Sequence, residues 1–227
     1  MTDLDHEKNI AATEAIKYIK NGMVVGLGTG STAQFMIRSL GKRVLAGLDI
    51  QGIPTSKATR KLAMECGIPL IELENVDKID ITIDGADEFD ADLQLIKGGG
   101  GALLHEKIIA YNSDLYIIIA DSKKRVDQLG NFKLPAETIP LATHHIMRTL
   151  TDMGLRPILR KDLEKVFVTQ EGNHILDLDI NHITDLKELE LSLKRIPGVV
   201  ETGLFLNMAD IIVMGKKEGP VIFKRAR

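Results

Sequence analysis

Three segments of the chain combine residue types and spacings that suit anion binding and proton transfer. The first is residues 26–33, GlyLeuGlyThrGlySerThrAla, where a buried strand is expected to pass into a helix. Glycines in such a turn let backbone N–H groups face an anion at the N-terminus of the helix. The hydroxyls of Thr29, Ser31 and Thr32 add donors. The segment predicts an anion site, with a tight turn that binds no ligand as the alternative.

The same segment matches part of a dinucleotide-binding fingerprint. Gly28, Gly30 and Ala33 have the Gly-x-Gly-x-x-Ala spacing, but the fingerprint also requires an acidic residue at the end of the second strand. Here that strand is expected to close with Thr55 and Ser56. The missing acid and the extra hydroxyls favour a phosphomonoester over NAD. The lack of a Walker lysine argues against a nucleoside triphosphate.

The second segment is Asp84-Gly-Ala-Asp87-Glu88, directly after a predicted strand. Open α/β sheets place their ligand crevice at the carboxyl ends of the strands. Carboxylates there can bind sugar hydroxyls, move protons or hold a divalent metal, and a solvated acidic loop is the alternative. Metal binding is less favoured, because Lys97 already supplies a positive charge and the nearest histidine is His105.

The third segment joins Lys97 to the four glycines Gly98–Gly101 and then to Glu106. A glycine run is unfavourable in backbone entropy, and its exposed N–H groups can stabilise an oxyanion. Glu106 is expected in the second turn of a helix that begins near Gly101. Burial there would raise its pKa into the range of a general base. The alternative is an exposed helical glutamate paired with a lysine.

Isolated basic residues can complete such a site. Lys8 on the first predicted helix, and Lys123 or Lys124 after a predicted strand, reach the crevice if the strands are neighbours; solvated lysines are the alternative. The histidines have no metal-ligand spacing. Cys66 is interpreted as a small core residue.

The elements that position these segments alternate in the first half of the chain. Apolar, β-branched strands between helices indicate a parallel sheet covered on both faces, a doubly wound α/β unit. Hydrophobic periodicity predicts helices over residues 6–19, 33–40, 57–66 and 102–112, and strands over 23–28, 70–73, 79–83 and 115–120, with one more ending at Thr55–Ser56.

The pattern changes across residues 126–140, which are interpreted as a crossing between domains. The following order approximates a β-α-β-β-α-β sandwich. Its predicted elements are a helix over 143–153, a strand near 157–160, paired strands over 166–169 and 174–180, a helix over 186–196 and a strand over 199–205. Terminal strands over 211–214 and 221–224 are expected to form a hairpin on either domain.

Composition excludes several classes of protein. The 227 residues are 44% hydrophobic and 27% charged, which is ordinary for a globular chain. A net charge of −3 leaves no basic excess for nucleic acid or an anionic membrane surface. Cys66 is the only cysteine, the N-terminus does not match a signal peptide, and no apolar run approaches the ~18 residues of a spanning helix. We expect a soluble cytoplasmic protein without nucleic-acid or membrane partners.

Four groups of residues follow one another in an order that resembles a known family. They are residues 26–33, 84–88, 95–104 with 106–108, and 197–205 with 208–210. Together they resemble the ribose-5-phosphate isomerase type A family. The resemblance implies a Rossmann-like catalytic domain of residues 1–130 plus 206–227, a smaller ferredoxin-like α+β domain of residues 131–205, and a homodimer or homotetramer.

The family interconverts ribose 5-phosphate and ribulose 5-phosphate through an enediolate, in the non-oxidative pentose phosphate pathway. The resemblance thus implies a sugar phosphate as the partner, no cofactor and no metal. Glu106 matches the general base, Asp84 and Asp87 the acidic pair of ring opening, and Lys97 with the glycine amides the group that stabilises the oxyanion. The implied substrate-binding residues are Thr29, Gly30, Ser31, Thr32, Gly98, Gly99, Gly100, Gly101, Lys8 and Lys124, with Lys123 as the alternative to Lys124.

Three departures from the family pattern bear on substrate affinity more than on reaction type, and two other functions compete with the isomerase. His105 stands where an arginine is expected, residues 89–91 replace a proline-bearing segment, and residues 136–140 differ from a valine-rich strand. A related deaminase or acyl-CoA transferase would need an amino-sugar site or a glutamate nucleophile, and Glu106 is compatible with the latter. A sugar-phosphate sensor would bind without turnover. The complete catalytic set and the lack of a DNA-binding segment favour the isomerase.

Overall fold

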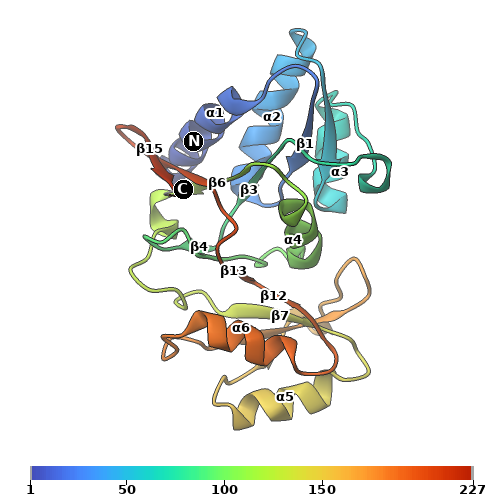
Figure 1. Ribbon diagram of the computed structural model, residues 1–227, viewed down its shortest axis with the longest axis vertical. Coiled ribbons are helices and arrows are strands. Elements are labelled where there is room, and N and C mark those ends of the chain that lie inside the picture. The colour runs from blue at the N-terminus through green and yellow to red at the C-terminus, as the bar shows by residue number, and fades with distance from the viewer. Residues whose placement is uncertain (1, 226–227) are drawn as a thin grey trace.

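The computed structural model describes residues 2–225, arranged around a large sheet, a smaller antiparallel sheet and a short three-stranded sheet between them (Figure 1). The large sheet has the spatial order β15-β14-β6-β3-β1-β2. All its neighbours are parallel except β15, which pairs antiparallel to β14. Its strands are β1 (Met23–Leu27), β2 (Ile50–Pro54), β3 (Ile81–Gly85), β6 (Tyr116–Asp121), β14 (Ile211–Lys216) and β15 (Gly219–Lys224).

The strand order creates the place where a ligand can bind. After β1 the chain adds β2 on one side, and then returns to add β3 on the other side of β1. The connections that leave the carboxyl ends of β1 and β3 therefore diverge to opposite sides, which is the switch point where open α/β sheets form a crevice. The predicted segments 26–33 and 84–88 follow these two strands.

Helices cover both faces of the large sheet because its strands are apolar on both faces. In β6 every residue is buried; Ile117 and Ile119 join the core cluster under α1 and α2, whereas Tyr116 and Ile118 join the cluster on the opposite face. Here α1 spans Asp3–Ala15 and ends in a 3-10 turn, η1 (Ile16–Tyr18), and α2 spans Ser31–Leu45. α3 (Lys57–Glu65) packs against α2 and β2, and α4 (Leu103–Tyr111) contacts β3.

The three-stranded sheet connects the large sheet to the rest of the molecule. It has the order β13-β5-β4 and is antiparallel, with β4 at Glu88–Phe89, β5 at Leu95–Ile96 and β13 at Leu204–Phe205. Phe89, Leu95 and Phe205 pack under the large sheet, whereas Ile96 and Leu204 pack into the core of the small sheet. Successive residues of β5 thus face the two cores.

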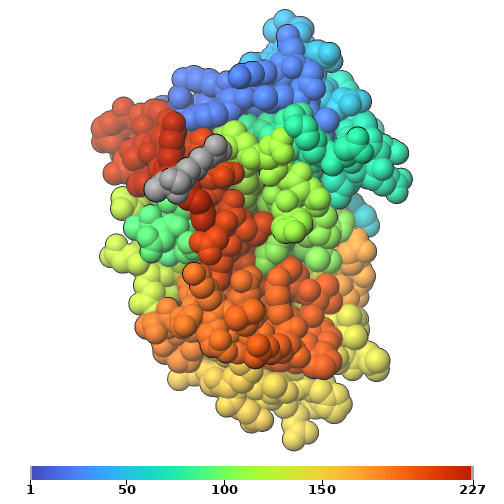
Figure 2. Space-filling view, viewed as in Figure 1, coloured from blue at the N-terminus to red at the C-terminus, as the bar shows by residue number. Residues whose placement is uncertain are grey.

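The small sheet has the β-α-β-β-α-β order that the sequence approximates, but its first strand, β7, lies in residues 126–140, for which the sequence predicts a crossing between domains. That interpretation was wrong for this part of the segment, because β7 pairs with both β11 and β12. Its spatial order is β12-β7-β11-β8 with every neighbouring pair antiparallel, and α5 and α6 contribute to its core. This ferredoxin-like arrangement confirms the predicted fold class. Its elements are β7 (Leu134–Thr138), α5 (Thr143–Asp152), β8 (Ile158–Leu159), β11 (His174–Leu178), α6 (Leu186–Lys194) and β12 (Val199–Thr202). The space-filling view places α5 and α6 at the opposite end of the molecule from α1 and α2 (Figure 2).

Two strand predictions were wrong in ways that the hydrogen bonds explain. Residues 70–73 do not form a strand, because their pairing is limited to a single bridge between Leu70 and Gly52, after which the 3-10 turn η2 (Leu73–Asn75) begins. The predicted strand 199–205 is divided at Gly203 between two sheets. A Cβ at Gly203 would lie 2.2 Å from the carbonyl oxygen of Lys97, so only glycine allows the crossing there.

The predicted hairpin of residues 166–169 and 174–180 is reduced to one bridge, between Val168 and His174. The cause is that β11 pairs with β7 and β8, while β10 (Lys165–Val166) pairs with β9 (Lys161–Asp162). The C-terminal hairpin of β14 and β15 forms as predicted, on the large sheet.

Candidate active site

A pocket of about 90 Å³ opens beyond the carboxyl ends of β1 and β3. Because parallel neighbours end at the same edge, residues far apart in sequence meet there. The pocket is lined by Thr29, Gly30, Ser31, Thr32, Gly85, Ala86, Asp87, Lys97, Gly98, Gly99, Gly100, Glu106 and Lys124. All the residues predicted for the site are in this lining except Lys8, Asp84 and Gly101.

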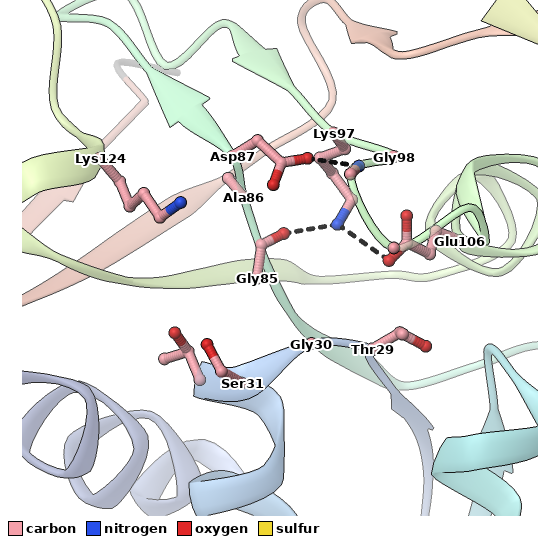
Figure 3. Close-up of a pocket in the computed structure, with 13 residues that line it drawn as sticks. Thr29, Gly30, Ser31, Gly85, Ala86, Asp87, Lys97, Gly98, Glu106 and Lys124 are labelled. Carbon is pink, nitrogen blue, oxygen red and sulfur yellow. Dashed lines mark hydrogen bonds and ion pairs between the residues drawn. The ribbon is translucent and has the colours of Figure 1, made fainter. Parts of the chain in front are cut away.

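One side of the pocket has the groups that could hold an anion. Gly30 has a φ of 111°, which favours glycine, and it lets α2 begin at Ser31 with its first N–H groups at the pocket. Lys124, in the 3-10 turn η3 (Ser122–Lys124), projects toward the pocket across from Ser31 (Figure 3). Lys124 rather than Lys123 lines the pocket. Lys8 lies outside the lining, and its Nζ donates to Ser31 Oγ at 3.0 Å.

Thr29 is held by hydroxyls on the neighbouring strand end. Its Oγ1 lies 2.7 Å from Thr55 Oγ1 and 3.1 Å from Thr59 Oγ1, and it donates to Ser56 Oγ at 2.8 Å. The Thr29 hydroxyl is therefore engaged by these three hydroxyls. Thr55 and Ser56, which stand where a dinucleotide fold has an acid, stabilise the loop that carries Thr29.

The opposite side of the pocket holds a buried cluster of one cation and two carboxylates. Lys97 Nζ lies 3.1 Å from Asp84 Oδ2 and 3.4 Å from Glu106 Oε1, and it donates to the carbonyl of Gly85. Asp84 Oδ1 accepts N–H bonds from Thr29 at 3.0 Å and from Gly85 at 2.7 Å. Asp84 is completely buried, so it reaches a ligand only through Lys97. Burial raises the pKa of Asp84, against the opposing effects of the Lys97 cation and of the N–H groups of Gly85 and Thr29.

Glu106 is the carboxylate of this cluster whose proton is easily exchanged. Burial raises the pKa of Glu106 to about 8, against the opposing effect of the Lys97 cation. Burial acts to lower the pKa of Lys97, but the charges of Asp84 and Glu106 outweigh it, so that pKa is raised and the ammonium stays protonated. Glu106 Oε2 has no hydrogen-bond partner among residues 2–225 and belongs to the pocket lining. It is therefore placed to exchange a proton with a bound molecule.

The glycine run offers fewer N–H groups than the sequence predicts. The N–H of Gly101 turns back to the carbonyl of Gly98 at 3.0 Å, and the N–H of Gly99 donates to Asp87 Oδ2 at 2.7 Å. Within residues 2–225, the N–H groups of Gly98 and Gly100 donate to no acceptor. These two remain for a ligand.

Glu106 lies in a different turn from the predicted one, and two nearby residues, Glu88 and His105, lie outside the pocket lining. α4 begins at Leu103, so Glu106 lies in its first turn rather than its second. Glu88, the third carboxylate of the acidic segment, is buried away from the pocket and accepts N–H bonds from Gly130 and Phe132. His105 Nε2 lies 2.7 Å from Glu171 Oε1, outside the pocket lining.

In the described part of the chain, no three His, Cys, Asp or Glu side chains are grouped to hold a metal ion.

Comparison with known proteins gives the family. Residues 51–219 match the family model described as ribose 5-phosphate isomerase A (phosphoriboisomerase A). The chain belongs to this family. The curated ribose-5-phosphate isomerase A of Roseobacter denitrificans is 49% identical, over 97% of this chain and 87% of that protein.

Solved structures of the family have the same fold as this chain. A D-ribose-5-phosphate isomerase in complex with phospho-erythronic acid superposes with a TM-score of 0.95 at 41% identity, covering 99% of this chain and 100% of that one. Ribose 5-phosphate isomerase A from Neisseria gonorrhoeae superposes with a TM-score of 0.93 at 38% identity, covering 100% of both chains. The sequence resemblance and the fold that it implies are confirmed.

Some residues around the pocket had no signal in the sequence. Gly85 and Ala86 lie between the predicted acidic residues, and their position in that segment could have suggested them. Arg160, from the other half of the chain, donates to the carbonyls of Gly98 and Gly99. No local motif connects Arg160 to this family site, because only the packing of the two sheets brings it there.

Proposed function

We propose that this chain interconverts ribose 5-phosphate and ribulose 5-phosphate through an enediolate, as a step of the non-oxidative pentose phosphate pathway. The observation that carries the proposal is the carboxylate of Glu106, with a pKa of about 8 and an unpaired oxygen, beside the Lys97 ammonium in a pocket of a ribose-5-phosphate isomerase A family member. The similar D-ribose-5-phosphate isomerase whose structure was solved in complex with phospho-erythronic acid supports a sugar phosphate as the ligand of this chain.

In this proposal, one side of the pocket binds the phosphate and the other side carries out the proton transfer. The N–H groups at the start of α2 and the Lys124 ammonium hold the phosphate, so its binding orients the carbons at the other end of the sugar. Glu106 removes the proton from C2 of the open-chain aldose, and the electron pair moves toward the C1 oxygen. Lys97 and the N–H groups of the glycine run stabilise the enediolate. Glu106 then returns its proton to C1, while the hydroxyl proton passes from O2 to O1.

The acidic pair has two different tasks in this proposal. Asp87 lines the pocket and is fixed by the N–H of Gly99, so it takes part in ring opening and in the transfer of hydroxyl protons. Asp84 is buried and keeps Lys97 charged and directed at the pocket. Asp84 is therefore a positioning residue, which narrows the role that the family resemblance implies for it.

The reaction class is tested with the purified protein, ribose 5-phosphate and EDTA. We expect ketose to form at an undiminished rate with the chelator present. Folded protein that produces no ketose would contradict the proposal. A mass increase after incubation with acyl-CoA would then indicate a glutamate nucleophile and a transferase, and binding of ribose 5-phosphate without either reaction would indicate a sensor.

The phosphate anchor is tested by Lys124→Ala, with Lys123→Ala as the matched control. Loss of one charge-assisted hydrogen bond is expected to raise KM for ribose 5-phosphate about 10- to 100-fold and to leave kcat close to its original value. Lys123, next in sequence but outside the pocket, should give ordinary kinetics when replaced. Steady-state kinetics of both variants give the comparison, and an unchanged KM in Lys124→Ala would move the anchor elsewhere.

The pH dependence follows from the raised pKa of Glu106. A general base must be ionised to accept a proton, so kcat/KM should fall as the pH drops below about 8, by about tenfold per unit. Above that pH the carboxylate is ionised and the profile should level off. The profile is measured with ribose 5-phosphate in buffers of constant ionic strength. An acid limb near the ordinary glutamate pKa of 4.5 would contradict this role for Glu106.

We also propose two domains, residues 1–130 plus 206–227 and residues 131–205, in a homodimer or homotetramer in the cytoplasm. Separate hydrophobic clusters under the two sheets support the division. Light scattering of the purified protein tests the self-association. The single free Cys66 is in keeping with a reducing compartment. No helix within residues 2–225 is both long and apolar enough to cross a membrane.

A further inference from the structure

Arg160 connects the small sheet to the backbone of the glycine run. It directly follows β8, and its Nη1 donates to the carbonyl of Gly98 at 2.8 Å and to that of Gly99 at 3.2 Å. Its Nε and Nη2 donate to the two carboxylate oxygens of Asp177, on β11, at 3.0 and 2.5 Å. The Arg160 side chain is only 13% exposed. One guanidinium therefore joins a carboxylate of the small sheet to two carbonyls of the pocket lining.

These contacts determine the orientation of two peptide groups. In a planar trans peptide the C=O and the N–H point in opposite directions. With the Gly98 carbonyl on Arg160, the N–H of Gly99 points to the other side, where it donates to Asp87 Oδ2. With the Gly99 carbonyl on Arg160, the N–H of Gly100 is likewise directed away from Arg160. Gly100 lines the pocket, and its N–H donates to no acceptor in residues 2–225.

Phe167 supports the end of the same run. A Cβ at Gly101, whose φ is 76°, would lie 2.3 Å from Phe167 Cζ, so the ring packs directly against this glycine. The Arg160 guanidinium lies 5.9 Å from the centre of the Phe167 ring, and the Phe167 N–H donates to the Arg160 carbonyl at 3.0 Å. Because glycine has the greatest backbone freedom, four in a row need outside contacts to keep one conformation.

We propose that Arg160, oriented by Asp177, is a positioning residue for the isomerisation: it holds the glycine run so that the N–H of Gly100 faces the charge that develops on the substrate. The inference rests on the proposed function for the identity of that charge. Arginine can make all these contacts because the N–H groups of its planar guanidinium donate to a carboxylate and to two carbonyls at the same time. A lysine ammonium cannot do this. The competing explanation is that Arg160 only ties the two sheets together.

The test compares Arg160→Met with Arg156→Met, which removes an arginine from the exposed ion pair with Asp179 close by. Each variant is measured for kcat and KM, for its inhibition constants with phospho-erythronate and with inorganic phosphate, and for Tm. In Arg160→Met we expect kcat to fall about 100-fold, as for other misplacements of about 1 Å at a site. The inhibition constant of phospho-erythronate should rise, because the proposed function places its carboxylate at the glycine end. That of inorganic phosphate should not change.

Variants of Asp177 provide a second test of the proposal. Asp177→Asn should reduce kcat less than Arg160→Met does, and the double variant should be no slower than Arg160→Met alone, because Asp177 acts through Arg160. Additive losses would contradict this arrangement. If Arg160→Met does not fold, Arg160→Lys keeps a charge beside Asp177 without the fork, and the same selective loss is expected from it.

Several results would overturn the inference. A lowered Tm with kcat and both inhibition constants unchanged would mean that Arg160 only joins the sheets. An equal weakening of inorganic phosphate and phospho-erythronate would mean that the whole pocket is distorted. If the unaltered protein binds both anions but forms no ketose, the proposed function fails instead; the contrast between the two anions still decides whether Arg160 positions the glycine end.

Discussion

Replacing Glu106 by glutamine is expected to lower kcat by about 10²- to 10⁴-fold, the usual contribution of a positioned acid–base group, while the affinity for phospho-erythronate changes little. Glutamine fills the same volume beside Lys97 and lines the same pocket, but it cannot accept the proton from C2. Discontinuous or coupled assays of ketose formation give kcat of the variant. Isothermal titration calorimetry gives its affinity for phospho-erythronate.

The control for this prediction is Glu171→Gln, which removes a carboxylate that contacts His105 outside the pocket lining. We expect this variant to keep the original kcat. If Glu106→Gln bound phospho-erythronate as tightly as before and still turned over at the original rate, Glu106 would not be the base. If it lost both binding and turnover, its main role would be to hold Lys97.

Lys97→Met is expected to remove nearly all activity and to destabilise the protein by about 3–5 kcal/mol, the usual result of breaking a buried ion pair by deleting one partner. Methionine fills part of the space but leaves Asp84 and Glu106 facing each other in a buried site without a cation. Loss of the ammonium also removes the group that stabilises the enediolate. Denaturant unfolding and ketose assays measure the two effects.

The pH dependence of this destabilisation has a definite sign. Without Lys97, the attraction that lowers the pKa of both carboxyls is gone, so their folded-state pKa values rise further above their unfolded values. A group with a raised folded pKa favours the folded state at low pH and loses that contribution as the pH rises through the folded value. The loss of stability should therefore be larger at pH 9 than at pH 5, values that bracket the pKa of about 8 for Glu106. An equal loss at both would argue against buried ionised carboxyls.

Local patterns predicted most of the fold because helices and strands of this chain have clear hydrophobic periods. The apolar run of residues 115–120, most of which lies in β6, and the glycine-rich turn before α2 needed no tertiary information. Predictions failed where backbone partners decided the outcome. Residues 199–205 are continuous in pattern, yet Gly203 passes so close to the Lys97 carbonyl that the strand divides between two sheets.

Residue types and spacing by themselves determined the three pocket segments, the family and the candidate base Glu106. Only the tertiary structure decided how these groups act on one another: that Asp84 is buried under Lys97, that Gly101 turns its N–H inward, and that Arg160 reaches the glycine run. The physical reason is that motifs record local chain geometry. Charge pairing, burial and carbonyl orientation depend on residues far apart in the sequence, such as Arg160 and Gly98, which are 62 positions apart and meet only when the two sheets pack.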